Sequence, residues 1–205
     1  PLRPHVSKVS IALAQANDTR PLGDFVNTAT VSKIETVVGG SDSDTVTLNS
    51  AVIKGSIDLG AGDDTLAFGN FTNVATIANV ETVSFGSGAD TITFASQLSS
   101  GSLNLGAGAD TLTLGNFVNS GTVLGVETLL GGSDADTISL GSVFTRGSVD
   151  LGSGADSLTL GNFANIGSVG NVETLVGGTA NDTLTMMTVL SNASVDLGSG
   201  ADVLT

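Results

Sequence analysis

The 205-residue sequence contains no cysteine, tryptophan or tyrosine, and its single histidine is His5. Without cysteine there can be neither a disulfide scaffold nor a thiolate metal site, and one histidine is too few for an ordinary zinc site. Basic residues are also scarce, because 6 of them stand against 20 acidic residues and the net charge is −14. This charge would repel phosphate groups, so we expect no nucleic-acid partner. No continuous apolar run of about 18 residues is present, so we also expect no transmembrane segment.

Glycine and aliphatic residues make up much of what is present. The chain has 28 glycines, a hydrophobic fraction of 40% and an aromatic fraction of 4%. We therefore expect a core of valine, leucine, isoleucine and alanine rather than a disordered chain.

A repeat of 46 residues runs along the chain without gaps. Four residue types recur at this step: Glu35, Glu81, Glu127 and Glu173; Asp44, Asp90, Asp136 and Asp182; Asp64, Asp110, Asp156 and Asp202; and Phe25, Phe71, Phe117 and Phe163. Regular repeats of this length are typical of stacked architectures and not of ordinary globular domains.

Each repeat contains two related halves that read strand, glycine loop, aspartate, strand. In residues 45–48, Val46 and Leu48 alternate with Thr45 and Thr47. A period of two residues indicates a β-strand with one buried face. The sequence therefore predicts an all-β fold.

The spacing of the loop aspartates, 20 and then 26 residues, favours a right-handed parallel β-solenoid. We predict two coils per repeat, of about 20 and 26 residues, with all glycine loops stacked in one column. The rival arrangement has one 46-residue coil per repeat and two loop columns. It would bring Glu35 and Glu81 within roughly one strand spacing of each other, where like charges are destabilising.

The repeat also predicts the domain organisation. Residues 1–25 form a degenerate N-terminal capping half-repeat, in which Leu13–Phe25 keeps the register of Leu59–Phe71 without its loop glycines. Residues 26–205 form the tandem repeats, and the register predicts that the natural protein continues beyond residue 205.

The glycine loops have the composition of a hard-cation site. In Gly39–Val46, glycines can turn backbone carbonyls toward one point, and Asp44 supplies a charged oxygen. Ca²⁺ accepts about six to eight such oxygen ligands in flexible geometry. Asp-Gly loops also make simple tight turns, but eight loops in register favour calcium.

Eight stretches resemble the RTX, or haemolysin-type, calcium-binding nonapeptide repeat. They read GGSDSDTV, LGAGDDTL, FGSGADTI, LGAGADTL, GGSDADTI, LGSGADSL, GGTANDTL and LGSGADVL. The resemblance implies that loop carbonyls and a sixth-position aspartate of consecutive turns hold each ion. The implied metal-site residues are Asp44, Asp64, Asp90, Asp110, Asp136, Asp156, Asp182 and Asp202, with Gly40, Gly60, Gly86, Gly106, Gly132, Gly152, Gly178 and Gly198.

Several features depart from this pattern or compete with it. Asp42, Asp134 and Ala180 replace the fourth-position glycine. About seven Ca²⁺ between eight stacked loops would roughly cancel the charge of −14. The Glu35 column is typical of a solvated face or side-chain ladder, with an extra cation as the alternative. Phe71 is expected to fill the wider coil, and Asn70 to form a ladder with Asn116 and Asn162.

The resulting functional prediction is a calcium-binding structural module, not an enzyme, of a secreted bacterial cell-surface or extracellular protein such as an S-layer, adhesin stalk or filament. Its expected partners are calcium ions and further copies, through stacking into a longer rod. The alternatives are an accessory repeat domain of a secreted enzyme and, with less support, an ice-binding solenoid with outward threonine rows. Glycine fragments that precede strands do not indicate a dinucleotide site, which needs a helix.

Overall fold

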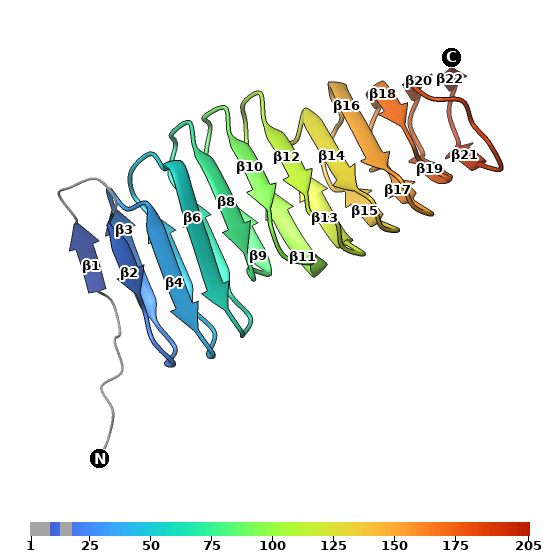
Figure 1. Ribbon diagram of the computed structural model, residues 1–205. Helices are drawn as coiled ribbons and strands as arrows, with labels where there is room; N and C mark the ends of the chain where they lie inside the picture. The colour runs from blue at the N-terminus through green and yellow to red at the C-terminus, as the bar shows by residue number, and fades with distance from the viewer. Residues whose placement is uncertain (1–8, 13–17) are drawn as a thin grey trace.

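The structure is a computed structural model that describes residues 9–12 and 18–205, and these residues contain strands and turns but no helix. The 22 strands alternate between two sheets of eleven parallel strands each (Figure 1). The odd sheet contains β1 (Val9–Ala12), β3 (Thr28–Ser32), β5 (Thr45–Leu48), β7 (Thr65–Phe68), β9 (Thr82–Ser84), β11 (Ser99–Asn104), β13 (Ser120–Leu124), β15 (Thr137–Leu140), β17 (Ser157–Thr159), β19 (Thr174–Gly178) and β21 (Ser194–Gly198). The even sheet contains β2 (Thr19–Pro21), β4 (Thr36–Gly40), β6 (Ile53–Gly60), β8 (Val74–Ala78), β10 (Thr91–Phe94), β12 (Thr111–Leu114), β14 (Thr128–Gly132), β16 (Thr145–Gly152), β18 (Ile166–Gly170), β20 (Thr183–Met186) and β22 (Val203–Leu204).

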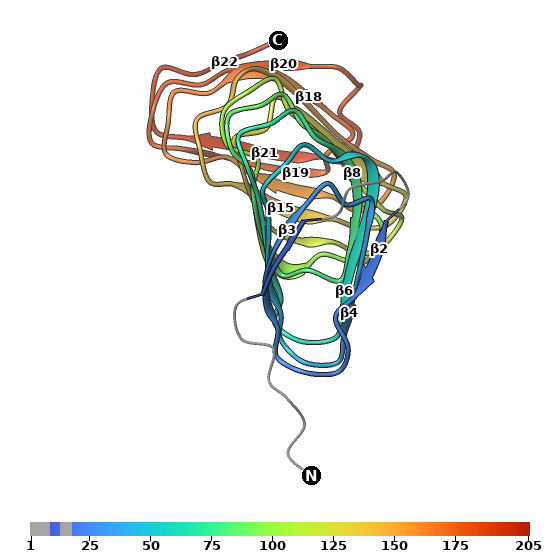
Figure 2. The same cartoon turned by 90° about the vertical axis from the view of Figure 1, so that its left-hand side faces the viewer.

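Consecutive strands belong to opposite sheets, so one odd and one even strand make one coil of a parallel β-solenoid, as predicted. The two-residue alternation explains why each strand has a buried and an outer face: in β5, Val46 and Leu48 are buried, whereas Thr45 and Thr47 are exposed. The buried side chains form one core between the sheets. Figure 2 shows that the coils at the C-terminal end are turned relative to those at the N-terminal end, as expected for twisted sheets.

The predicted alternation of 20- and 26-residue coils is wrong in its longer coil. Strand pairing steps by 17 residues from Thr28 to Thr45 and by 20 residues from Thr45 to Thr65. Thr45 and Thr137 lie two sequence repeats apart in the same sheet, five coils apart, whereas Thr91 lies in the other sheet. One 46-residue repeat therefore makes two and a half coils. The rival 46-residue coil is wrong for the same reason.

This half-coil offset puts the glycine loops on two edges instead of one column. Turns that lead into odd strands form the first edge, at the lower side of Figure 1, and turns that lead into even strands form the second edge. Asp44 and Asp64 lie on the first edge, and Asp90 and Asp110 lie on the second. The glutamates are likewise divided, because Glu81 and Glu173 precede odd strands whereas Glu35 and Glu127 precede even strands.

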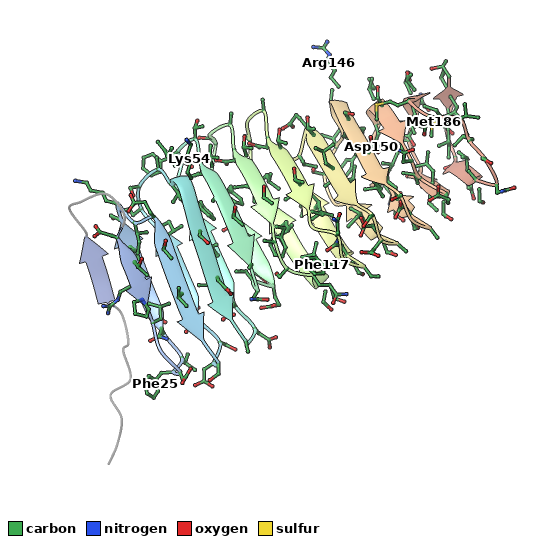
Figure 3. All side chains as sticks on the ribbon, viewed as in Figure 1. Phe25, Lys54, Phe117, Arg146, Asp150 and Met186 are labelled. Atoms are coloured by element: carbon green, nitrogen blue, oxygen red, sulfur yellow. The ribbon has the colours of Figure 1, made fainter. Side chains whose placement is uncertain are left out.

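The phenylalanines of the 46-residue column do not fill the coils. Phe71, Phe117 and Phe163 are 38–42% exposed, and Figure 3 shows Phe25 and Phe117 at the first edge. The fully buried rings are Phe94 and Phe144. The ladder expected of Asn70, Asn116 and Asn162 is also absent, since their turns lie on alternating edges: Asn70 adjoins Gly86, and Asn116 adjoins Gly132.

The N-terminal half-repeat is described only in part. Residues 1–8 and 13–17 lie outside the described residues, including the first part of the Leu13–Phe25 segment. Within the described part, β2 pairs in parallel with β4 and continues the even sheet. No helix in the described residues is long and apolar enough to cross a membrane.

Candidate metal site

A polar residue occupies the corner directly before most strands. Along each edge, four successive coils carry corner residues in the order Asn, Asp, Asp, Glu, and we call such a set a stack. Its first gap separates the Asn and Asp coils, its middle gap the two Asp coils, and its last gap the Asp and Glu coils. The stacks are Asn27–Asp44–Asp64–Glu81 and Asn119–Asp136–Asp156–Glu173 on the first edge, and Asn73–Asp90–Asp110–Glu127 and Asn165–Asp182–Asp202 on the second.

Each corner side chain accepts a hydrogen bond from the backbone of the coil before it. In the third stack, the Asn119 N–H donates to Asp136 Oδ1 at 2.9 Å, and the Asp136 N–H donates to Asp156 Oδ1 at 2.7 Å. The Asp156 N–H donates to Glu173 Oε2 at 2.8 Å. Buried backbone N–H groups need an acceptor, so this ladder gives every corner side chain a structural role with or without a metal.

The second carboxylate oxygen of the aspartates has no such role. Seven loop aspartates are at most 1% exposed, and in each of them Oδ2 is buried without a hydrogen-bond partner: Asp44, Asp64, Asp90, Asp110, Asp136, Asp156 and Asp182. An unpaired buried oxygen costs about 1–3 kcal/mol, and more when it is charged. The seven carboxylates therefore require a proton or a cation.

The asparagine at the head of each stack indicates what surrounds this second atom. Asn119 Oδ1 accepts from the Leu98 N–H at 3.0 Å, as the Oδ1 of each aspartate accepts from the preceding coil. Its amide nitrogen Nδ2 is 2.8 Å from Phe117 O, 3.1 Å from Gly115 O and 2.9 Å from Asp136 Oδ1. Two carbonyls of its own turn and the next carboxylate thus converge on Nδ2.

Asp136 Oδ2 corresponds to Asn119 Nδ2, because both residues place Oδ1 on the backbone N–H of the preceding coil. The amide nitrogen donates hydrogens to the oxygens around it, whereas a carboxylate oxygen cannot. An ionised Asp136 would therefore set one oxygen against others unless a cation lies between them. The first gap is bridged by an amide, and the middle gap lacks such a bridge.

Oxygen ligands of this kind suit Ca²⁺. Within residues 9–12 and 18–205, no three histidine, aspartate or glutamate side chains gather at one point. A cation in the middle gap would therefore combine Asp136 and Asp156 with backbone carbonyls of their two loops. Mixed carboxylate and carbonyl ligands in flexible loops fit Ca²⁺ better than Mg²⁺, which requires near-octahedral geometry.

Glycine allows the two loops of a middle gap to approach each other. Gly152 has φ +92°, and a Cβ atom there would lie 2.1 Å from Gly132 O in the loop above. Any side chain at this position would separate the loops. The expected positive φ is found for Gly152 and its counterparts Gly60, Gly106 and Gly198 in the second loop of each pair, but not for Gly132 in the first.

The structure brings the predicted site residues together in four pairs. The paired aspartates are Asp44 with Asp64, Asp90 with Asp110, Asp136 with Asp156, and Asp182 with Asp202. The paired glycines are Gly40 with Gly60, Gly86 with Gly106, Gly132 with Gly152, and Gly178 with Gly198. The structure does not bring Asp64 next to Asp90, because they lie on opposite edges.

Burial and like charge both act on the second aspartate of a pair. Burial raises the pKa of the Asp64 carboxyl to about 6, the nearby Asp44 and Glu81 carboxylates add to this effect, and a hydrogen bond from the Asp44 backbone opposes it. Burial likewise raises the pKa of Asp110 to about 6. These two carboxyls are therefore held in surroundings that disfavour their charge.

Sequence reasoning did not identify the asparagine corners. Asn27, Asn73, Asn119 and Asn165 recur at the same 46-residue step, and each follows a Gly-x-Phe-x turn and precedes a strand. That recurrence was the available signal. The glutamates are neither a solvated face nor a continuous ladder, since each accepts from the aspartate N–H of the preceding coil.

Comparison with known proteins gives one match. Residues 123–142, which include the Gly131–Asp136 loop, match the family of the RTX calcium-binding nonapeptide repeat (4 copies). No curated protein sequence and no solved structure shows significant similarity to the chain. The match and the parallel β-solenoid both fit an RTX repeat protein.

Proposed function

We propose that this chain, with its RTX-type calcium-binding repeats, is a structural module that Ca²⁺ makes rigid, in a secreted bacterial cell-surface or extracellular protein such as an S-layer, adhesin stalk or filament. The observation that carries the proposal is the buried, unpaired Oδ2 of Asp44, Asp90, Asp136 and Asp182 in the middle gaps. The proposal gives the chain no catalytic role. Bound Ca²⁺ would supply positive charge between two stacked loops.

The chain's own residues determine how such binding would affect the fold. In the third stack, Asp136 and Asp156 stand on successive coils and are linked by one backbone hydrogen bond of 2.7 Å. Without a cation, their charges oppose the stacking of the two loops. With a cation, the same charges hold the coils together, so metal binding contributes directly to the free energy of folding.

Calcium removal tests this proposal. We expect the complete chain to lose much of its far-ultraviolet β signal in EGTA and to regain it in excess Ca²⁺, but not in equimolar Mg²⁺. The sample is first shown to be metal-free by elemental analysis. A β signal that is the same in metal-free and calcium-loaded protein would overturn the proposal.

Secretion and self-association are the finer parts of the proposal. RTX repeats are typical of secreted proteins, and disorder at the low calcium level of the cytosol would be compatible with export before folding. Fractionation of the source cells should find the protein in the medium or on the surface, and not in the cytosol. Electron microscopy of the natural protein with Ca²⁺ should show filaments or a lattice. Discrete particles would favour an accessory repeat domain of a secreted enzyme.

The shape of the outer faces gives ice binding little support. Thr91 and Thr111 are neighbours on the even sheet, and Thr45 and Thr65 are neighbours on the odd sheet. Both sheets twist along the solenoid, as Figure 2 shows, so the hydroxyl rows do not lie on one flat plane.

A further inference from the structure

The last gap of each stack has the features of the middle gap without a second glycine loop. Asp156 is 1% exposed, and its Oδ2 has no hydrogen-bond partner. Its backbone N–H donates to Glu173 Oε2 at 2.8 Å, as the Asp136 N–H donates to Asp156 Oδ1. Glu173 therefore does for the last gap what Asp156 does for the middle gap, and both gaps have a carboxylate on each side.

The same arrangement occurs in two other stacks. The Asp64 N–H donates to Glu81 Oε2 at 2.8 Å, and the Asp110 N–H donates to Glu127 Oε2 at 2.8 Å. Asp64 and Asp110 are both buried, and both have an unpaired Oδ2. By correspondence with the asparagine amide, this oxygen faces the carbonyls of the second glycine loop and the glutamate carboxylate.

We propose that the last gap is a second kind of calcium site, formed by an aspartate, a glutamate and the carbonyls of one glycine loop. The three sites pair Asp64 with Glu81, Asp110 with Glu127, and Asp156 with Glu173. The proposal rests on calcium binding in the middle gaps, and it differs because only one loop of each site follows the nonapeptide pattern. The long glutamate side chain reaches the gap from a coil whose turn carries no such loop.

The first gap is the internal contrast that limits the number of ions. There the amide of Asn119 already donates to a carboxylate and to carbonyls, so the gap needs no cation. Four middle gaps and three last gaps then give seven ions per chain, whereas middle gaps alone give four.

Counting bound calcium in the complete wild-type chain tests the proposal without any substitution. Elemental analysis after dialysis, together with calorimetric titration of the metal-free protein, should give seven Ca²⁺ per chain. Four Ca²⁺ per chain would overturn the second kind of site and leave the proposed function intact. No bound Ca²⁺ at all would instead refute the proposed function.

Glu127→Gln then assigns the ion to its site. Glutamine keeps an oxygen for the Asp110 N–H but removes the charge, so the hydrogen-bond ladder is retained. We expect one ion fewer than in the wild type and an unchanged β signal in saturating Ca²⁺. The matched control Asp134→Asn removes an exposed loop carboxylate and should keep the full count. Glu173→Gln repeats the test on the other edge, and an unchanged count in both glutamine variants would overturn the proposal.

Discussion

The first and middle gaps of one stack solve the same packing problem in two ways. Asn119 and Asp136 occupy equivalent corners, and each uses Oδ1 to accept a buried backbone N–H. They differ in the second atom, which is an amide nitrogen with oxygen neighbours in Asn119 and an unpaired oxygen in Asp136. One chemical group therefore separates a joint that is complete within the protein from one that depends on a cation.

Substitutions of Asp136 should produce the largest effect and should separate its two roles. Asp136→Ala removes the acceptor of the Asn119 N–H and Nδ2, so we expect the free energy of unfolding to fall by about 3 kcal/mol or more, with or without Ca²⁺. Asp136→Asn keeps the acceptor and adds an amide. It should unfold at higher urea concentration than the wild type in EGTA and at lower urea concentration in Ca²⁺.

Urea unfolding in the two buffers checks this pair. Asp134→Asn on the same loop serves as the control, because its side chain is exposed and is not part of the ladder. If Asp136→Asn were less stable than the wild type in EGTA as well, the difference between the two gaps would not be electrostatic.

The reverse substitution, Asn119→Asp, should create a site. It replaces the bridging amide with an oxygen that faces Asp136 across the first gap. We expect about one additional bound Ca²⁺ and a loss of roughly 1–3 kcal/mol in EGTA, because two buried carboxylates then oppose each other. Asn116→Asp on the same turn but away from the corner is the control. A variant that loses stability in EGTA and gains no ion would show that the first gap cannot admit a cation.

Much of this arrangement was predictable, and the missing part has a physical explanation. The step between Asp44, Asp90 and Asp136 gave the repeat, and the alternation in Thr45–Leu48 gave the strands, because both depend on local sequence. The number of coils per repeat was not predictable from glycine loops alone. The 17-residue coils end at Asn73 or Glu81, whose turns lack the nonapeptide pattern, so two kinds of coil were read as one longer coil.

The pH dependence of the calcium-free protein should give a smaller effect. Burial raises the pKa of Asp64 and Asp110 from 3.8 to about 6 in the folded state. Between these values the folded chain holds protons that the unfolded chain releases. The stabilisation from these two groups is thus complete below 3.8 and is lost as the pH rises through about 6.

Urea unfolding in EGTA between pH 4.5 and 6.5, about the window set by these pKa values, measures this slope. The double variant Asp64→Asn/Asp110→Asn should flatten it. In saturating Ca²⁺ the trend should reverse, because the metal binds the deprotonated carboxylates. A wild-type stability in EGTA that does not fall through this window would mean that the two corners are not protonated on folding.

Phe117→Ala should produce the smallest effect and should show which part of the asparagine turn matters. Asn119 Nδ2 donates to the backbone carbonyl of Phe117, and this carbonyl remains in the variant. The ring is 40% exposed and lies beside Gly115, so its removal should cost at most about 1–2 kcal/mol. The calcium count should be unchanged, in contrast to Asn119→Asp. A change in the count, measured by the same titration, would mean that the ring holds the first gap closed and that the amide alone does not.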